Sequence, residues 1–411
     1  MGAVCITGAD QVSSLGLGLQ ELSSSLDSAR GTAQTLELDL PGPGLIRAPV
    51  CRVSAELPGV APSKVPMDRN TAMSLYVAQR AWQSAGWSES ELNRDRLGVF
   101  WGSGMGGAHT FDQTCHALYA EQRRIRPTSV VTTMPNAAVA EISLWAQARG
   151  ITQTYACACA SSAVALGEAL MAMRAGRVDV AIVGGSEAML TPGVIAGWSA
   201  MRVLAPVGED PGAACKPFDA QRNGFALGEG AAAFILETPA HAKRRGAQVM
   251  GQLSGYGIST DAVHITNPDP QGQVKAMRMA LNDAGLATED IGYINAHGTA
   301  TLAGDLAEAM SIGEVFAGLR VPVSSTKALH GHLLGAGGAL EMLIALQALL
   351  SWDSHQSLRA NLGPLTISAA LAAVILSTSG SFTPSHDMTF DMIWTSSTKP
   401  FGNNGRIGRS V

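Results

Sequence analysis

The sequence lacks the features that are typical of membrane, secreted and zinc-binding proteins. Its longest apolar run, residues 367–377, is too short to span a bilayer, so we expect no membrane insertion. We find no basic segment followed by an apolar core and a cleavage site, and we expect no signal peptide. The six cysteines show no zinc-like pairing, because Cys157 and Cys159 are too close together for the usual zinc spacings. These absences predict a reduced, cytoplasmic protein.

The fraction of aromatic residues and the magnitude of the net charge are also low. The formal net charge of −5 gives no indication of nucleic-acid binding, and aromatic residues make up only 5% of the chain. Glycine is abundant, with 46 residues, and hydrophobic residues reach 46%. This mixture is typical of tightly packed α/β layers and unlike that of a disordered chain. At 411 residues, the chain is long enough for two domains or two fused halves.

Buried strands and helices alternate along most of the chain. After the first strand we expect a loop-rich section to about Val65, because five prolines there exclude long helices. A second series of strands and helices begins near Val249, and we therefore divide the chain into residues 1–245 and 246–411. The hydrophobic pattern predicts strands at 4–8, 97–101, 178–185, 231–237 and 291–295, and helices at 71–86, 273–284 and about 332–350.

Cys159 lies where a short β-prone piece runs into a helix that continues to about Arg174. Unpaired N–H groups and the macrodipole at a helix N-terminus favour a thiolate, so Cys159 is a candidate nucleophile. Residues 160–162 have small side chains that would let a substrate carbonyl approach. However, most free cysteines are small buried hydrophobic residues, and this helix is apolar on nearly every face. Both interpretations stay open at this point.

Two further stretches are rich in polar residues that an ordinary core would avoid. His297 lies in the first, residues 295–301, and His330 and His332 lie in the second, residues 324–338. A single histidine is more often structural than catalytic, and no thiolate or carboxylate triad accompanies His330 and His332, so we expect no metal site. One cysteine with two histidines in loops rich in glycine and threonine suits acyl-thioester chemistry instead.

A strand ending at Trp101 is followed by a G-x-G-x-x-G pattern at residues 102–107. This pattern can indicate a dinucleotide site, but no clear βαβ unit with a ribose-binding acid follows at the expected spacing. We therefore interpret it as a tight backbone turn near the active site.

These motifs resemble those of the β-ketoacyl-[acyl-carrier-protein] synthases, close to the type II elongating enzymes of bacterial fatty acid synthesis. The likeness rests on A-C-A-S-S at 158–162, N-A-H-G-T-x-T at 295–301 and V-S-S-T-K-x-x-x-G-H at 323–332, with support at 217–222, 228–231 and 261–266. It spans about residues 1–350 in the family's order. It implies an α/β thiolase-type fold, in which two related halves form a five-layered α-β-α-β-α arrangement, usually as a homodimer.

The resemblance also implies roles for individual residues. Cys159 would carry the acyl group as a thioester, and His297 and His332 would bind the malonyl thioester and promote its decarboxylation. Lys327 would orient His332 and the local charge network, with Glu308 as its partner. Acyl carrier protein would deliver the substrates on its phosphopantetheine arm, so that no other cofactor is needed. The implied substrate-binding residues are Thr299, Thr301, His264, Thr266 and Thr398, and the implied carrier-protein contacts are Arg123, Arg124, Arg126 and Arg202.

The C-terminal segment departs from the family pattern N-S-F-G-F-G-G-x-N. Thr398 and Pro400 stand where the family has its two aromatic residues, and Leu302 stands where it often has proline. We therefore expect altered control of the acyl chain or weakened activity. Two alternatives follow: a non-catalytic, chain-length-setting partner in a ketosynthase heterodimer, and a coenzyme A-dependent thiolase. Cys159 with both histidines argues against the first, and the absence of a cysteine beyond Cys215 argues against the second.

Overall fold

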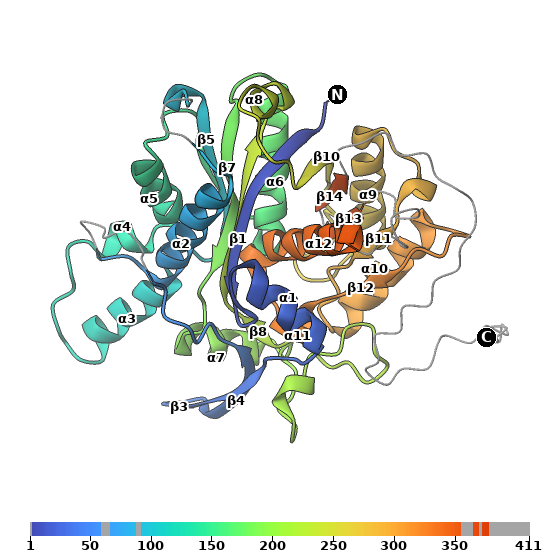
Figure 1. Ribbon diagram of the computed structural model, residues 1–411. Helices are drawn as coiled ribbons and strands as arrows, with labels where there is room; N and C mark the ends of the chain where they lie inside the picture. Colours follow the sequence, from blue (N-terminus) through green and yellow to red (C-terminus); the bar gives the residue numbers. More distant parts are fainter. Residues whose placement is uncertain (1, 59–65, 88–91, 355–364, 370–371, 378–411) are drawn as a thin grey trace, which may run out of the picture.

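The computed structural model describes residues 2–58, 66–87, 92–354, 365–369 and 372–377. Figure 1 shows its elements stacked as five layers. Helices α2 (Arg69–Ser84) and α5 (Ala137–Ala146) form one outer layer, and α9 (Pro270–Ala284) and α10 (Leu302–Val315) form the other. Helices α6 (Ser161–Arg174) and α12 (Gly337–Ser354) lie between the two layers of strands. The predicted order α-β-α-β-α is therefore present.

The strands of the two halves repeat one topology. In each half the central strand order, counted along the chain, is 3-2-4-5-1, with strand 5 antiparallel to both of its neighbours. This shared order makes the two halves related at the level of topology. In the first half the strands are β1 (Val4–Ser13), β5 (Leu97–Gly102), β6 (Thr152–Tyr155), β7 (Val180–Glu187) and β9 (Gly230–Glu237). In the second they are β10 (Gly251–Ile258), β11 (Tyr293–Asn295), β12 (Val323–Ser324), β13 (Leu365–Ala369) and β14 (Ala372–Ser377).

The first strands of the two halves pair with each other. β1 and β10 are antiparallel, with Val4 opposite Leu253 and Ile6 opposite Gly251. This pairing joins the two series into a single hydrogen-bonded sheet with a mirrored strand order. The boundary that we predicted between residues 245 and 246 falls in the connection between α8 (Pro239–Arg244) and β10. It stays a prediction.

The central helices are buried because nearly all of their residues are small or apolar. In α6, Ala165, Leu166 and Leu170 have no solvent exposure, and in α12 the same is true of Leu340 and Leu343. A helix that is apolar on every side is stable only when other elements surround it. The two layers of strands provide that cover, so the ends of α6 and α12 are held rigidly relative to the strands.

The section before residue 65 contains more regular structure than we predicted. An 11-residue helix, α1 (Gly18–Ser28), precedes the first of the prolines, so they do not interrupt it. The next section forms the hairpin of β3 (Gln34–Leu40) and β4 (Gly44–Cys51), and β8 (Leu227–Gly228) pairs with β4 to complete a small sheet. The remaining described strands and α-helices are β2 (Gly16–Leu17), α3 (Ala108–Tyr119), α4 (Ser129–Thr133), α7 (Pro192–Ala200) and α11 (Lys327–His330).

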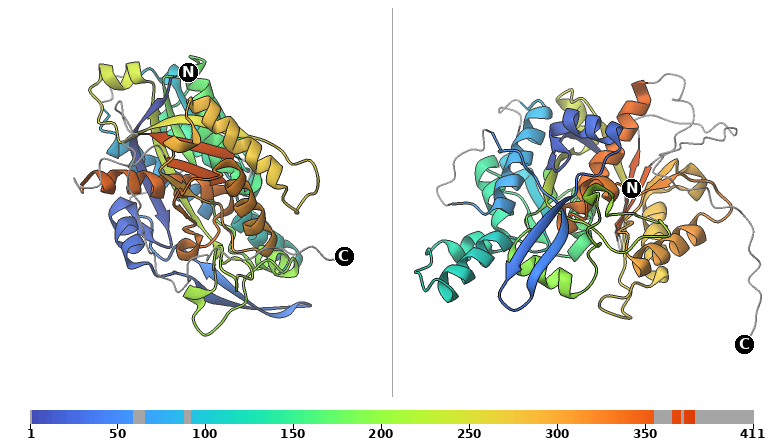
Figure 2. Two further views of the ribbon diagram at one scale, coloured as in Figure 1. Left: turned by 90° about the vertical axis from the view of Figure 1, so that its right-hand side faces the viewer. Right: turned by 90° about the horizontal axis from the view of Figure 1, so that it is seen from below.

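The two further views in Figure 2 show the hairpin of β3 and β4 projecting from the layered body. Among the helices that the structure describes, none combines the length and the apolarity needed to cross a bilayer.

Candidate active site

Cys159 lies in a single 3-10 turn, Ala158–Ala160, between the end of β6 and the start of α6. The residue before it, Ala158, has a left-handed φ of 50°, which is uncommon for a residue with a side chain. The end of β5 passes very close to the start of α6, because a Cβ built on Gly102 would lie 2.3 Å from the backbone nitrogen of Ser162. The backbone around Cys159 is therefore tightly constrained. The predicted strand-to-helix junction is confirmed.

His332 comes from the second half and faces this cysteine. Its Nε2 lies 3.0 Å from the Sγ of Cys159. Its backbone pairs with β8, since its N–H donates to Ala226 and its carbonyl accepts from Gly228. The ring of Phe225 packs edge-to-face against the imidazole, with 5.3 Å between the ring centroids. These contacts hold the ring against the sulfur.

One hydrogen bond assigns the proton on His332. Its Nδ1 accepts from the backbone N–H of Leu334 at 3.3 Å, which requires a lone pair on Nδ1. Burial and the nearby Lys327 ammonium lower the pKa of His332 well below its usual value, so the ring is neutral at pH 7. A neutral ring with a free Nδ1 carries its proton on Nε2. His332 therefore points an N–H donor at the site of Cys159.

His297 follows β11 and completes the group. Its ring lies edge-to-face against His332, with 5.2 Å between centroids, and burial also lowers its pKa well below the usual value. Its loop is fixed by Glu308, a carboxylate on α10 that accepts from the backbone N–H groups of His297 and Gly298 at 2.7 Å each. The structure thus brings Cys159, His297 and His332 together from sequence positions up to 173 residues apart.

The expectation that the helix N-terminus would favour a thiolate is wrong in direction. Burial raises the pKa of Cys159 to about 12, and the carboxylates of Glu187 and Glu341 add to the rise, while Lys327 opposes it. Removal from water penalises the charged form more than the helix end favours it. At rest Cys159 is therefore a thiol.

Lys327 is fully buried, and its ammonium forms an ion pair with the equally buried carboxylate of Glu341. We predicted Glu308 as its partner, and this is a correction. Both oxygens of Glu308 already accept backbone N–H groups, whereas Glu341 lies in the second turn of α12, directly beside Lys327. Lys327 affects His332 through its charge, since no hydrogen bond joins the two side chains in the described structure.

Comparison with known proteins identifies the family. The model of the β-ketoacyl synthase N-terminal domain matches residues 2–242, and that of the β-ketoacyl synthase C-terminal domain matches residues 250–376. The chain belongs to the β-ketoacyl synthase family. The 3-oxoacyl-[acyl-carrier-protein] synthase 2 of Staphylococcus aureus is 39% identical over 284 residues, which cover 68% of this chain and 70% of that protein. Nodulation protein E of Rhizobium leguminosarum bv. trifolii is 40% identical over 288 residues, 69% of this chain and 70% of its own length.

Solved structures of ketosynthases have the same fold. The ishigamide ketosynthase/chain length factor superposes with a TM-score of 0.82 at 27% identity, covering 92% of this chain and 99% of that one. A β-ketoacyl synthase from Burkholderia phymatum STM815 gives a TM-score of 0.78, also at 27% identity, covering 92% of this chain and all of its own. The predicted thiolase-type α/β fold is confirmed.

The three central side chains of this β-ketoacyl synthase also satisfy a simple geometric test for a metal site. One ligand atom from each of Cys159, His297 and His332 lies within 4.8 Å of the others. A histidine that binds a metal offers a lone pair to it and donates its other N–H to an acceptor. In His332 the arrangement is reversed, because Nδ1 accepts from Leu334 and Nε2 keeps the proton. The cluster therefore suits a developing negative charge better than a cation.

The G-x-G-x-x-G segment forms a tight turn beside this site. The backbone N–H groups of Gly104 and Met105 donate to the carboxylate of Glu187, which also accepts from Gly335, three residues after His332. The segment's amides are therefore turned inward, away from any phosphate, and our interpretation as a turn is confirmed. Sequence analysis missed Glu187, although a charged residue at the end of an apolar strand was a usable signal.

The predicted substrate-binding residues lie in separate segments of the chain. Thr299 and Thr301 follow His297, and their hydroxyl oxygens lie 2.9 Å apart, with Thr301 also capping α10. His264 and Thr266 lie in an exposed loop, where the Nδ1 of His264 accepts from the backbone of Thr266 at 3.1 Å. Thr398 lies outside the described residues.

The predicted carrier-protein contacts are all exposed. Arg123, Arg124 and Arg126 follow α3, and Arg123 forms an ion pair with Glu121. Arg202 is exposed just after α7 and has a left-handed φ of 57°. Their function stays a prediction.

His330, which we considered as a metal ligand beside His332, is fully buried and bonds through Nε2 to the hydroxyl of Thr326 at 3.0 Å.

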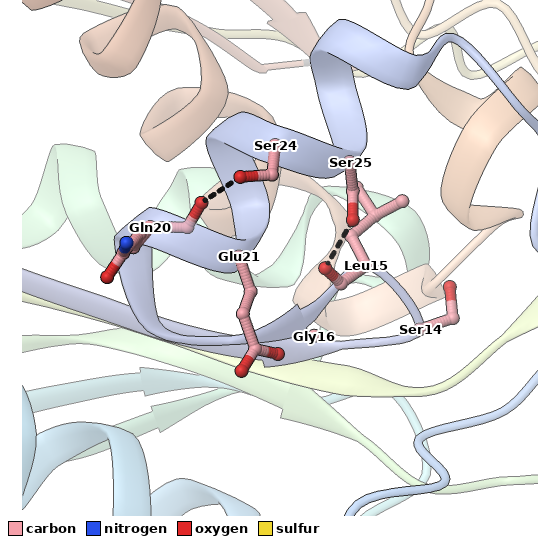
Figure 3. Close-up of a pocket in the computed structure, with 7 residues that line it drawn as sticks. All are labelled: Ser14, Leu15, Gly16, Gln20, Glu21, Ser24 and Ser25. Carbon is pink, nitrogen blue, oxygen red and sulfur yellow. Dashed lines mark hydrogen bonds between the residues drawn. The ribbon is translucent and has the colours of Figure 1, made fainter.

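A separate cleft of about 560 Å³ lies at the start of α1. Figure 3 shows that its polar side chains already bond within the segment: Ser25 donates to the carbonyl of Leu15 and Ser24 to that of Gln20. None of the predicted site residues lines it. The lining residues are Ser14, Leu15, Gly16, Gln20, Glu21, Ser24 and Ser25.

Proposed function

We propose that the chain catalyses the decarboxylative condensation of an acyl thioester with malonyl-acyl carrier protein, giving β-ketoacyl-acyl carrier protein. The observation that carries this proposal is the juxtaposition of the Cys159 thiol with two neutral imidazoles. Its relatives include a 3-oxoacyl-[acyl-carrier-protein] synthase and nodulation protein E, so chain elongation in fatty acid synthesis or in a dedicated polyketide-like pathway fits the family.

In the first half-reaction Cys159 takes the acyl group from its carrier. The sulfur attacks the thioester carbonyl, a new C–S bond forms, and the bond to the phosphopantetheine sulfur breaks. The thiol proton of Cys159 leaves with the released carrier thiol, so the exchange is balanced. The 3.0 Å contact with His332 stabilises charge on the sulfur during the attack, because the Nε2–H donates to it.

In the second half-reaction the malonyl thioester loses CO₂. The electron pair of the broken C–C bond becomes an enolate, and its oxygen needs hydrogen-bond donors at the moment the charge appears. His297 and His332 are neutral and adjacent, with His332 buried and His297 half-buried, which suits them to donate to this oxygen. The enolate carbon attacks the acyl thioester of Cys159, and the released sulfur regains a proton. This chemistry needs no cofactor beyond the phosphopantetheine that arrives on the carrier.

The partner in this reaction is acyl carrier protein, whose arm would pass Thr299 and Thr301 on its way to Cys159. We assign Arg123, Arg124, Arg126 and Arg202 to the docking of that acidic protein, since all four are exposed. We keep His264 and Thr266, two exposed loop residues, as candidate substrate-binding residues. We place the reaction in the cytoplasm, where the six free cysteines would stay reduced.

A second copy of the chain, or a related subunit, would cover one edge of the sheet. β6 is the terminal strand of the first half, and it has no partner on its outer side in the described structure. Large apolar side chains on the neighbouring helices are exposed in the single chain, as expected for a dimer interface. They are Phe111, Leu118, Val130, Val131 and Leu144.

The test is the intact mass of the protein after incubation with a panel of acyl-acyl carrier protein thioesters. We expect a mass increase equal to one acyl group in the wild type and in Cys157→Ala, whose exposed thiol lies two residues from the nucleophile. We expect no increase in Cys159→Ala. A folded wild-type protein that no donor acylates would favour the non-catalytic partner subunit instead. An adduct that persists in Cys159→Ala would overturn the assignment of the nucleophile.

A further inference from the structure

Glu187 is the last residue of β7, and it has no solvent exposure. A buried carboxylate is usually paired with a cation. In the described structure Glu187 forms no ion pair, and its oxygens instead accept hydrogen bonds from three backbone N–H groups and from the side chain of Ser103. Gly104 and Gly335 donate to Oε2 at 2.7 and 3.0 Å, and Met105 donates to Oε1 at 3.1 Å.

These donors belong to two separate turns. Gly104 and Met105 lie in the glycine-rich turn after β5, and Gly335 lies in the 3-10 turn Leu334–Ala336 that precedes α12. The two turns pass so closely that a Cβ built on Gly335 would lie 2.4 Å from the nitrogen of Gly104. Two backbone segments that present N–H groups toward each other have no means of pairing directly. The carboxylate between them supplies the acceptor that both lack.

The second of these turns controls the proton on His332. Leu334, whose N–H donates to the Nδ1 of His332, is the residue directly before Gly335. Any shift of Gly335 therefore moves the donor that keeps the Nε2 of His332 protonated. We propose that Glu187 is a positioning residue, which holds the Leu334–Ala336 turn so that His332 directs its Nε2–H at the reacting thioester. This inference rests on the proposed condensation.

The substitution Glu187→Gln removes one of the two acceptor oxygens and replaces it with an NH₂ group. That group is a donor, and it would face backbone donors on at least one side. We expect the 334–336 turn to move by a few tenths of an ångström, which is enough to weaken the Leu334 to His332 hydrogen bond. Because a misplacement of about 1 Å costs about 100-fold, we expect this smaller shift to reduce the rate of condensation by about 5- to 10-fold.

The experiment uses protein labelled with ¹⁵N in its histidines, in which the signals of His332 are assigned by their loss in His332→Gln. In the wild type we expect a protonated Nε2 and an unprotonated Nδ1. In Glu187→Gln we expect the Nδ1 and Nε2 shifts to move toward each other, as the two tautomers mix. The condensation rate is measured on the same samples, as β-ketoacyl product formed from pre-acylated enzyme.

Glu237→Gln is the matched control, because Glu237 is also a fully buried glutamate but pairs with His241 and Arg245 at the other end of β9. It should leave the His332 signals unchanged even if it lowers stability. Should Glu187→Gln fail to fold, Glu187→Asp tests the same point, since the shorter side chain keeps both carboxyl oxygens but cannot reach both turns.

Unchanged His332 shifts in a folded Glu187 variant would overturn the inference, as would a condensation rate within threefold of the wild type. The tautomer measurement does not require turnover. An inactive wild-type protein would therefore refute the proposed function while leaving the positioning role of Glu187 to be decided by the His332 shifts.

Discussion

Replacing Lys327 by methionine should destabilise the protein in a way that depends on pH. The ammonium of Lys327 and the carboxylate of Glu341 are both fully buried, and they pair with each other. Methionine fills a similar volume, so the substitution creates little cavity. It leaves the carboxylate of Glu341 without its counter-charge, and removing one partner of a buried ion pair costs about 3–5 kcal/mol.

The carboxylate can avoid this cost by taking up a proton. With an ordinary glutamate pKa of 4.5, protonation at pH 7 costs about 3.4 kcal/mol, at 1.36 kcal/mol per pH unit. The loss of unfolding free energy in Lys327→Met is therefore limited to about 3.4 kcal/mol at pH 7, and to about 1.4 kcal/mol at pH 5.5. The loss of unfolding free energy grows as the pH rises, because burial raises the pKa of Glu341 and the folded variant binds a proton that the unfolded chain releases.

Urea denaturation of four proteins measures these values: the wild type, Lys327→Met, Glu341→Leu and the double variant. We expect the double variant to recover to within about 1 kcal/mol of the wild type, because apolar residues can replace a buried pair at little cost. A parallel cycle of Lys327→Met with Glu308→Gln should give a smaller coupling energy, since no hydrogen bond joins those side chains. A double variant as unstable as Lys327→Met, or a loss that is equal at pH 5.5 and pH 7, would refute the reasoning.

Two further predictions concern glycine packing and pH. Gly102→Ala should lower the unfolding free energy by about 1–3 kcal/mol and slow acylation of Cys159, because its Cβ would overlap the backbone of Ser162. Gly313→Ala, in an exposed and open part of α10, should instead raise the unfolding free energy by about 0.5–1 kcal/mol. Thermal unfolding of both variants measures these changes, and a stabilised Gly102→Ala would contradict the packing argument. Burial lowers the pKa of His330 to about 3 from an ordinary 6.5, so its folded form resists protonation, and this one group should contribute a fall in unfolding free energy of about 1.4 kcal/mol per pH unit below 6.5. The fall should be less steep in His330→Gln, and equal slopes for the two proteins between pH 5 and 6.5 would argue against a neutral buried ring.

Local sequence patterns were sufficient to predict the positions of most strands and of the helix that follows Cys159. The strand ending at Glu237 and the helix from the Cys159 stretch to Arg174 lie where the apolar runs place them, because such runs need burial on all sides. The 3-2-4-5-1 order was not accessible, since it depends on pairings between residues more than two hundred positions apart. Helix α1 was missed because the prolines that follow it dominated the interpretation of that section.

The site residues that belong to sequence motifs were predicted, whereas those that only tertiary packing brings to the site were missed. Cys159, His297 and His332 belong to recognisable motifs, and the structure brings them together. The counter-charge of Lys327 was assigned to the wrong helix, because Glu341 looks like one polar residue in an otherwise apolar segment. The pKa of Cys159 was expected to fall because a helix end is visible in the sequence, whereas the depth of burial that raises it is not.

The central position of β1 has a consequence for synthesis of the chain on the ribosome. This strand is made first, yet the two strands that flank it along most of its length, β9 and β10, end at Glu237 and Ile258. At about 5–20 residues per second, β1 waits roughly 12 to 50 s for its partners to emerge. During that interval its ten residues, all of them buried in the folded protein, form an unpaired, aggregation-prone segment of the nascent chain. Newly made protein should therefore depend on chaperones that shield this strand until both halves have left the ribosome.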